Sequence, residues 1–294
     1  MNNRRFQTIK HSFTKNKFVA MGVIILAILT VASIFAFVSP YDPSKMSIPD
    51  RLQEPSMSHP FGTDDYGRDY LTRALYGGRV SLAVGFLAMV VSITIGTAVG
   101  TISGYFGGKL DNFLMRVVEV LMSIPSFFLM LLLNAYLKPG ITTLVLIIGL
   151  LTWMDTARIV RAETLSVKER EYVLYAKVSG QKSLMIIVRH IIPNILSTII
   201  IAATLTIATS ILMESSLSFL GLGIREPDSS WGSMLNNAQG YIGEAWYLTL
   251  FPGFLILLTV LSFNVIGEAL KKAFAPKGAG HETKVLSERS EKRV

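Results

Sequence analysis

The sequence has no cysteine, and this absence excludes both a disulfide framework and a metal site built on thiolates. Charged residues are also scarce: they form 16% of the 294 residues, against about 25% in an ordinary soluble domain. Only four histidines occur, and no two are three or four positions apart, so we expect no metal or haem site made by this chain alone. The chain also lacks a G-x-x-x-x-G-K-[ST] loop, which many ATPases use to bind phosphate.

Apolar residues, in contrast, are abundant: they make up 51% of the chain, and the mean hydropathy is +0.48. A helix needs roughly 20 mainly apolar residues to cross the bilayer core. Five long runs without charge meet or approach this length, and a sixth, shorter run is expected to continue past Asp155, because a carboxylate near a helix end can reach the interface. The five runs are 18–41, 80–108, 120–137, 190–213 and 245–267, and the sixth is 139–154. The sequence therefore predicts an all-α membrane protein with six transmembrane helices.

Basic residues indicate the orientation of these helices. If the N-terminal segment lies inside, the inside segments hold 21 of the 28 Lys and Arg residues, as the positive-inside rule predicts. This bias accounts for the net charge of +8, so no nucleic-acid partner is expected. Both termini are then cytoplasmic. The expected organisation is a cytoplasmic segment 1–17, a first transmembrane helix 18–38, an extracytoplasmic loop 39–79, a five-helix core 80–270 and a cytoplasmic tail 271–294.

The first run has a second interpretation, a cleaved signal peptide. Its apolar stretch of about 20 residues is longer than the typical 7–15 residues of a signal peptide, and no small-x-small cleavage site precedes Pro40. A retained membrane anchor is therefore favoured.

Small and ionisable residues within the runs give further expectations. Gly96, Gly100 and Gly104 form a groove that allows another helix to approach closely, but the pattern leaves open whether that helix belongs to this chain. Pro125 is expected to kink the third run. Arg116 and Glu119, three residues apart near its inner end, are placed to pair with each other.

The polar loop between the fourth and fifth runs has helical order. Acids at its start favour a helix N-terminus, and Gly180 would supply a left-handed C-terminal cap. Together they predict a short amphipathic helix over about 169–180. The pattern leaves open whether this helix lies on the membrane surface, packs on its own bundle or inserts into a groove of a partner. The residues spaced to form one face are Tyr172, Tyr175, Ala176 and Ser179.

A motif in this loop resembles a family signature. The run Glu171-Tyr172-Val173-Leu174-Tyr175-Ala176, followed by Gly180, Ile186, His190 and Pro193-Asn194, resembles the EAA signature of ABC-importer permeases. In that family the motif forms a coupling helix that docks into a cleft of the cytoplasmic ATPase. Tyr175 replaces the first of two alanines, which implies a partner groove with extra room. The resemblance assigns ATPase coupling to Glu171, Tyr172, Val173, Tyr175, Ala176, Ser179 and Gly180, and we expect Arg158, Arg161 and Arg189 to anchor the loop ends at the headgroup level.

Two further segments narrow the family. Residues 59–69 with Arg73 and 78–82, and residues 217–223 with 230–235, are similar to segments of dipeptide, oligopeptide and nickel permeases, and more to the C-type than to the B-type subunit. The sequence departs from that pattern at Glu268 and at 225–227. The resemblance places Asp64, Arg68 and Trp231 in a region that faces a binding protein or forms a gate. An aromatic interface belt is an equal interpretation for Trp231.

The resemblance implies a type I ABC importer permease fold in a bacterial inner membrane, with 80–270 as the permease core. It implies no enzyme activity and no cofactor bound by this chain, because ATP and Mg are expected on two partner ATPase subunits. The other expected partners are a second, B-type permease and an extracellular substrate-binding lipoprotein. The expected substrates are di- and oligopeptides, because the middle of the bundle is almost free of charge, and nickel or a metal chelate is the alternative. A secondary transporter is a distant alternative, and a membrane-embedded enzyme would need converging catalytic groups that the sequence does not present.

Overall fold

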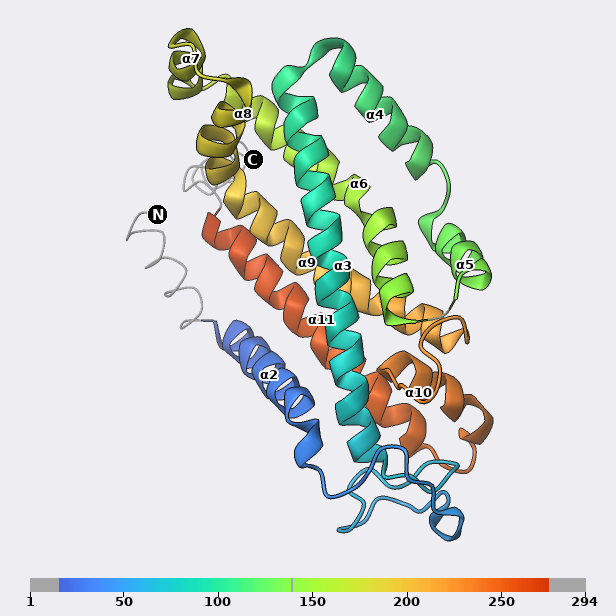
Figure 1. The fold of residues 1–294 in the computed structure, drawn as a ribbon. Coiled ribbons are helices and arrows are strands. Elements are labelled where there is room, and N and C mark those ends of the chain that lie inside the picture. Colours follow the sequence, from blue (N-terminus) through green and yellow to red (C-terminus); the bar gives the residue numbers. More distant parts are fainter. Residues whose placement is uncertain (1–15, 139, 275–294) are drawn as a thin grey trace, which may run out of the picture.

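The computed structural model describes residues 16–138 and 140–274, which form a helical bundle without a strand in these two stretches (Figure 1). Five helical runs are long and apolar enough to cross a membrane, and a bent pair of helices makes a sixth if it is counted as one span. This confirms an all-α chain with several apolar spans, five or six in number where the sequence predicts six. The predicted segments 1–17 and 271–294 lie mostly outside the described residues.

The helices follow one another in the order of the chain. The five spans are α2 (Lys17–Ile34), α3 (Tyr70–Phe106), α6 (Ile141–Lys168), the run Ser183–Phe219 and α11 (Tyr247–Phe274). The run Ser183–Phe219 consists of α8 (Ser183–Ile186), a π-helical turn (Ile187–Ile191) and α9 (Ile192–Phe219). The bent pair is α4 (Gly108–Met122) and α5 (Ser126–Tyr136), and the shorter helices are α7 (Glu171–Val178), α10 (Trp231–Ala238) and the 3-10 turns Ala36–Val38, Ile48–Asp50 and Gln239–Tyr241.

The second span starts ten residues earlier than the hydropathy predicted. Asp69 caps α3, because its side chain accepts the Thr72 N–H at 2.7 Å, and the helix then runs for 37 residues to Phe106. At 1.5 Å per residue α3 is about 55 Å long, far more than the bilayer core requires. Its first three turns therefore belong to the segment that the sequence assigned to the 39–79 loop.

The third span is bent, and the fourth is longer than its uncharged run. The third is broken, because α4 and α5 meet at 75° where Pro125 stands just before α5, which confirms a bend at Pro125. The fourth span continues past Asp155, as expected, in a 28-residue helix that ends at Lys168. Asp155 is exposed on this helix, so its charge does not end the span.

The glycine groove is filled by a helix of the same chain. A Cβ atom at Gly96 would lie 2.6 Å from the Cβ of Thr156, and one at Gly100 would lie 2.6 Å from the carbonyl oxygen of Ala157. Gly104 meets Thr164 in the same way. All three neighbours lie on α6, so the groove lets α3 and α6 pack closely within one subunit.

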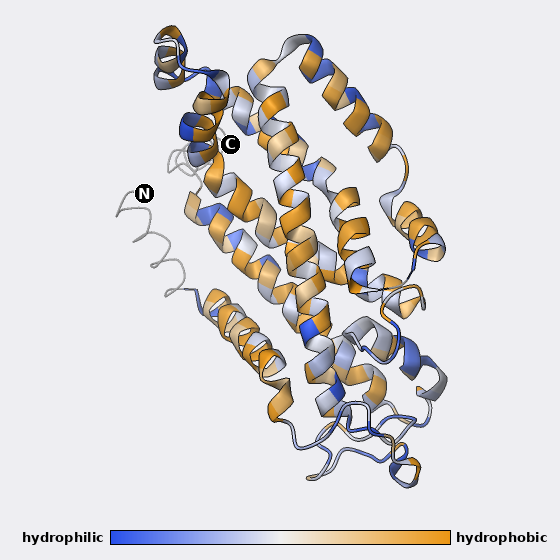
Figure 2. Ribbon diagram, in the orientation of Figure 1, coloured by the Kyte–Doolittle hydropathy of each residue, from blue (hydrophilic) through white to orange (hydrophobic). Residues whose placement is uncertain are grey.

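The bundle has two polar ends, which are built from different segments of the chain. One end carries α7 and the turn between α3 and α4, and the other carries α10 and the long segment before α3 (Figure 1). Figure 2 shows mostly hydrophobic spans between these ends, with the hydrophilic residues more frequent toward both. We refer to them as the α7 end and the α10 end.

Candidate functional site

The α7 end holds the predicted short helix, and its C-terminus has the expected glycine cap. Gly180 has a φ of +76°, in the left-handed region. The Gly180 N–H donates to the Lys177 carbonyl at 3.1 Å, and the Gln181 N–H donates to the Ala176 carbonyl at 3.2 Å. These two bonds are those of a Schellman motif, so the left-handed cap is confirmed.

The surface of α7 is divided differently from the predicted stripe. Val173 and Ala176 are buried in a cluster with aliphatic residues of the following helices, such as Ile186. Tyr175 and Val178 point away from the protein, with 78% and 89% of their surface exposed. Ala176 therefore does not share an outward face with Tyr175. The exposed residues here include the predicted Tyr172, Tyr175 and Ser179, together with Leu174 and Val178, which the sequence analysis missed.

The predicted motif residues after α7 make hydrogen bonds within the segment that joins α7 to α9. The His190 ring lies 3.1 Å from the side-chain oxygen of Gln181, and the Asn194 amide donates to the His190 carbonyl at 2.7 Å. His190 lies in the π-helical turn before α9. The motif thus links the end of α7 to the start of a span, and Gln181 is a member that sequence reasoning did not identify.

The three arginines expected to anchor the loop have separate surroundings. Arg161 donates two hydrogen bonds of 2.6 Å to the Asp111 carboxylate, which also accepts from Ser103. This arrangement joins α6 to α4 and α3. Arg158 lines a cleft between α4 and α6, and Arg189 is exposed on the π-helical turn.

The α10 end contains a buried ionic cluster. Asp64 contacts Arg68 at 2.7 Å and Arg73 at 3.4 Å, and Glu226 contacts Arg68 at 2.9 Å and Arg73 at 3.3 Å. Burial by itself would raise the pKa of Glu226, but the hydrogen bond and charge of Arg68, with the charge of Arg73, hold it below its usual value. The cluster ties the segment before α3 to the connection between α9 and α10.

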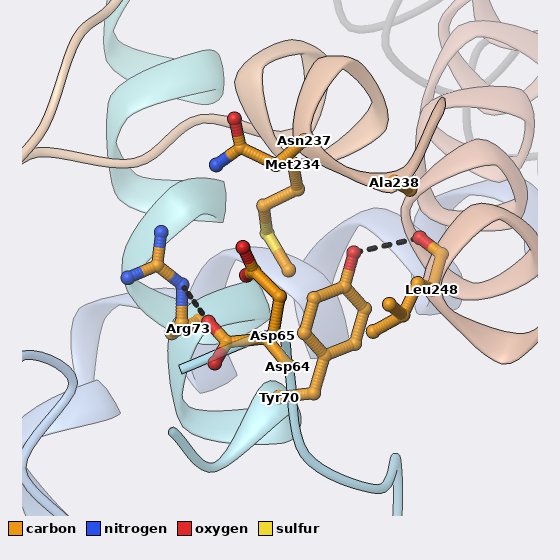
Figure 3. Close-up of a pocket in the computed structure, with 8 residues that line it drawn as sticks. All are labelled: Asp64, Asp65, Tyr70, Arg73, Met234, Asn237, Ala238 and Leu248. Carbon is orange, nitrogen blue, oxygen red and sulfur yellow. Dashed lines mark hydrogen bonds and ion pairs between the residues drawn. The ribbon is translucent and has the colours of Figure 1, made fainter. Parts of the chain in front are cut away.

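A small hollow adjoins this cluster (Figure 3). Figure 3 shows Arg73 directed at Asp64, and the Tyr70 hydroxyl donating to the Leu248 carbonyl, a bond of 2.6 Å. Asp65 also lines the hollow, and burial together with the charge of Asp64 raises its pKa. With a volume of about 10 Å³, the hollow has room for about one water and not for a substrate.

The predicted gate residues are brought together at this end, but they are buried. Asp64 and Arg68 belong to the ionic cluster, and Trp231, the first residue of α10, donates its indole N–H to the Ala74 carbonyl at 2.9 Å. Their side chains therefore hold the α10 end in shape and are not themselves a free contact surface. Burial also rules out an interface belt for Trp231, which packs against the start of α3.

A fully buried carboxyl group lies just after the apolar run 190–213, and the sequence analysis did not identify it. Glu214 lies inside α9 and accepts hydrogen bonds from Ser81 at 2.9 Å and from Ser218 at 2.7 Å. Ser81 also accepts the Trp231 backbone N–H at 3.2 Å. Glu214 thus joins α3, α9 and the start of α10. One feature of the sequence could have pointed to Glu214, because it is the first acidic residue after the apolar run 190–213. In the described residues no group of three side chains is arranged to hold a metal ion.

Comparisons with known proteins agree with this architecture. The family model described as "Binding-protein-dependent transport system inner membrane component" matches residues 96–278, and that of the "N-terminal TM domain of oligopeptide transport permease C" matches residues 5–55. The dipeptide transport system permease protein DppC of Bacillus subtilis is 41% identical over 265 residues, which cover 90% of this chain and 83% of that protein. The oligopeptide transport system permease protein OppC of Haemophilus influenzae is 42% identical over 276 residues, which cover 92% and 88%.

A solved structure shows the same fold. A chain of the MetNI methionine ABC transporter in an inward-facing conformation matches with a TM-score of 0.56 at 20% identity, covering 69% of this chain and 97% of that one. The family match spans more than half of the sequence, and the relatives cover most of its length. The chain is therefore a multi-pass membrane permease that belongs to the family of inner-membrane components of binding-protein-dependent transport systems.

Proposed function

We propose that this chain is one of two permease subunits of an ATP-driven importer, and that with a B-type permease it forms the path for di- and oligopeptides. The similarity to DppC and OppC supports this substrate class, because those relatives are permeases for dipeptides and oligopeptides and match about nine-tenths of the chain. An extracellular binding lipoprotein delivers the peptide. Two ATPase subunits hydrolyse ATP with Mg, and this chain binds neither.

The proposed topology places the α7 end in the cytoplasm and the α10 end outside, with both termini inside. The distribution of Lys and Arg supports it, since seven of these residues lie between Arg158 and Arg189. The ionic cluster at the α10 end then shapes the surface that faces the binding protein. Glu226 contributes to that surface, because its side chain is about two-fifths exposed.

The observation that carries the proposal is the apolar outward face of α7. Leu174, Tyr175 and Val178 are exposed at the end of a membrane bundle, where a soluble partner is able to cover them. The opposite face is fixed by Val173 and Ala176 in a cluster that includes residues of α6 and α9. An ATPase bound to the outward face of α7 would therefore displace α6 and α9, because the buried face of α7 packs against both.

Peptide uptake by the complete transporter tests this function. Proteoliposomes with both permeases, the ATPases and the binding protein should accumulate a labelled di- or tripeptide only when ATP is supplied. Tyr175→Glu should weaken ATPase binding by about tenfold or more, because it places a charge at the centre of an apolar contact. Tyr175→Phe, which keeps the ring, is the matched control and should transport normally.

Two results would contradict the proposal. Normal uptake and normal ATPase co-purification with Tyr175→Glu would remove α7 from the coupling role. A metal chelate, identified by mass spectrometry on the cognate binding protein in place of a peptide, would overturn the substrate class.

A further inference from the structure

A polar cleft of about 700 Å³ lies between α4 and α6, in the half of the bundle nearer α7. Its lining residues belong to these two helices, which diverge from each other in Figure 1. The cleft is lined by Asn112, Met115, Arg116, Val118, Glu119, Met122, Arg158 and Arg161. Half of these side chains are charged, although the cleft lies between helices of a membrane bundle.

The sequence of α4 distinguishes an apolar side from a polar side that faces the cleft. Its exposed apolar residues follow one line along the helix, at positions 110, 113, 117 and 120, which suits contact with lipid. Asn112, Arg116 and Glu119 follow a second line and face the cleft. Ionisable residues in membrane spans face a bundle interior or a water-filled cavity, because hydrocarbon cannot solvate them. The second line therefore marks the side of α4 that faces away from lipid.

The charges in the cleft do not cancel. Arg161 is neutralised by its two hydrogen bonds with Asp111, and Arg116 contacts Glu119 at 3.1 Å. Arg158 has no ion-pair partner in the described part of the chain. Its guanidinium group donates a hydrogen bond to the sulfur of Met122 at 3.8 Å. The cleft thus presents one uncompensated guanidinium group, whose planar fork of N–H donors matches a carboxylate.

We propose that Arg158 binds the terminal carboxylate of the transported peptide in this cleft, before the peptide is released into the cytoplasm. The proposal rests on the proposed function. A path for peptides of varied sequence has to bind a group that they all share, and the terminal carboxylate is such a group. Met115 and Met122 beside it are flexible and polarisable, so they adapt to different side chains.

Photo-cross-linking in the complete, nucleotide-free transporter tests the site. The probe is a tripeptide with a diazirine side chain at its C-terminal residue, and cross-links are mapped by mass spectrometry. In the wild type we expect adducts on the cleft segments around Met115 and Met122. Arg158→Gln should lower their yield by about tenfold, the loss expected for a hydrogen-bonded ion pair, and Arg158→Lys should give an intermediate yield. Lys109→Gln, which removes an exposed charge of α4 outside the cleft, should leave the yield unchanged.

The same probe with an amidated C-terminus separates the outcomes. In the wild type, amidation should reduce the cleft adducts as strongly as Arg158→Gln does, and in Arg158→Gln it should have no further effect. Equal yields from wild type and Arg158→Gln, in a transporter that imports the peptide, overturn the site and leave the proposed function intact. Failure of Arg158→Gln to assemble with the second permease also overturns it, because Arg158 would then pair with that subunit. A wild type that neither imports nor cross-links peptides overturns both proposals.

Discussion

Replacing Gly100 with alanine tests the packing of α3 against α6. The new methyl group would lie 2.6 Å from the Ala157 carbonyl oxygen and 2.8 Å from the Val160 Cβ, whereas ordinary contact begins near 3.4 Å. A backbone carbonyl cannot rotate away, so the two helices must separate locally by roughly 0.8 Å. Overpacking of this kind costs about 1–3 kcal/mol, and the better helix propensity of alanine returns up to about 1 kcal/mol.

The expected net loss for Gly100→Ala is therefore up to about 2 kcal/mol in the free energy of unfolding. Gly100→Val should lose more, because it adds two further methyl groups and gains less in helix propensity. Equilibrium unfolding of the purified subunit in mixed detergent micelles measures both. The matched control is Gly240→Ala, where no atom lies within 4 Å of the added group, and we expect a change within about 0.5 kcal/mol. A Gly100→Ala variant that is as stable as the wild type would refute the close approach of these helices.

Three further predictions concern the two ends of the bundle. Gly180→Ala should destabilise the end of α7 by about 1–2 kcal/mol, because the residue has a left-handed φ, and faster amide hydrogen exchange over 171–181 should report it. Asp111→Asn should cost about 1–3 kcal/mol by leaving Arg161 without its carboxylate, and detergent unfolding should detect this, with Glu119→Gln as the exposed control. The pKa of Glu226 is lowered in the folded state, so its ionised carboxylate stabilises the fold above the ordinary pKa, and this contribution is lost as the pH falls through the folded value. The wild type should therefore lose stability more steeply than Glu226→Gln below about pH 5. Parallel pH profiles of the two proteins would contradict the ion pairs.

Local features of the chain were predictable from the sequence. The cap at Gly180 depends on a few neighbouring residues, and the bend at Pro125 depends on the missing N–H and the ring of one residue. The pairing of Arg116 with Glu119 is likewise set by their three-residue spacing on a helix. In each case the interacting groups lie within one or two turns of chain, so their contact follows from helix geometry.

Features that depend on distant partners were not predictable. The start of α3 carries Arg73, which hydropathy assigns to a loop, but Asp64 and Glu226 neutralise this charge from other segments. The inner face of α7 is decided by a cluster that includes residues near Ile195, and not by the periodicity of α7 alone. The burial of Trp231 depends on the start of α3, more than 150 residues earlier in the chain. A single sequence does not show which of these segments meet.

The unbroken length of α3 has a consequence for how the two sides of a membrane are connected. The helix contains no proline, joins the ionic cluster through Arg73 at one end, and reaches the Asp111 bonding group through Ser103 at the other. No proline therefore interrupts the helix between these two contacts. For a straight helix of about 55 Å, a tilt of roughly 10° about its midpoint moves the two ends by about 5 Å in opposite directions. Such a tilt would widen the space beside the helix on one side of the membrane and narrow it on the other side in the same motion.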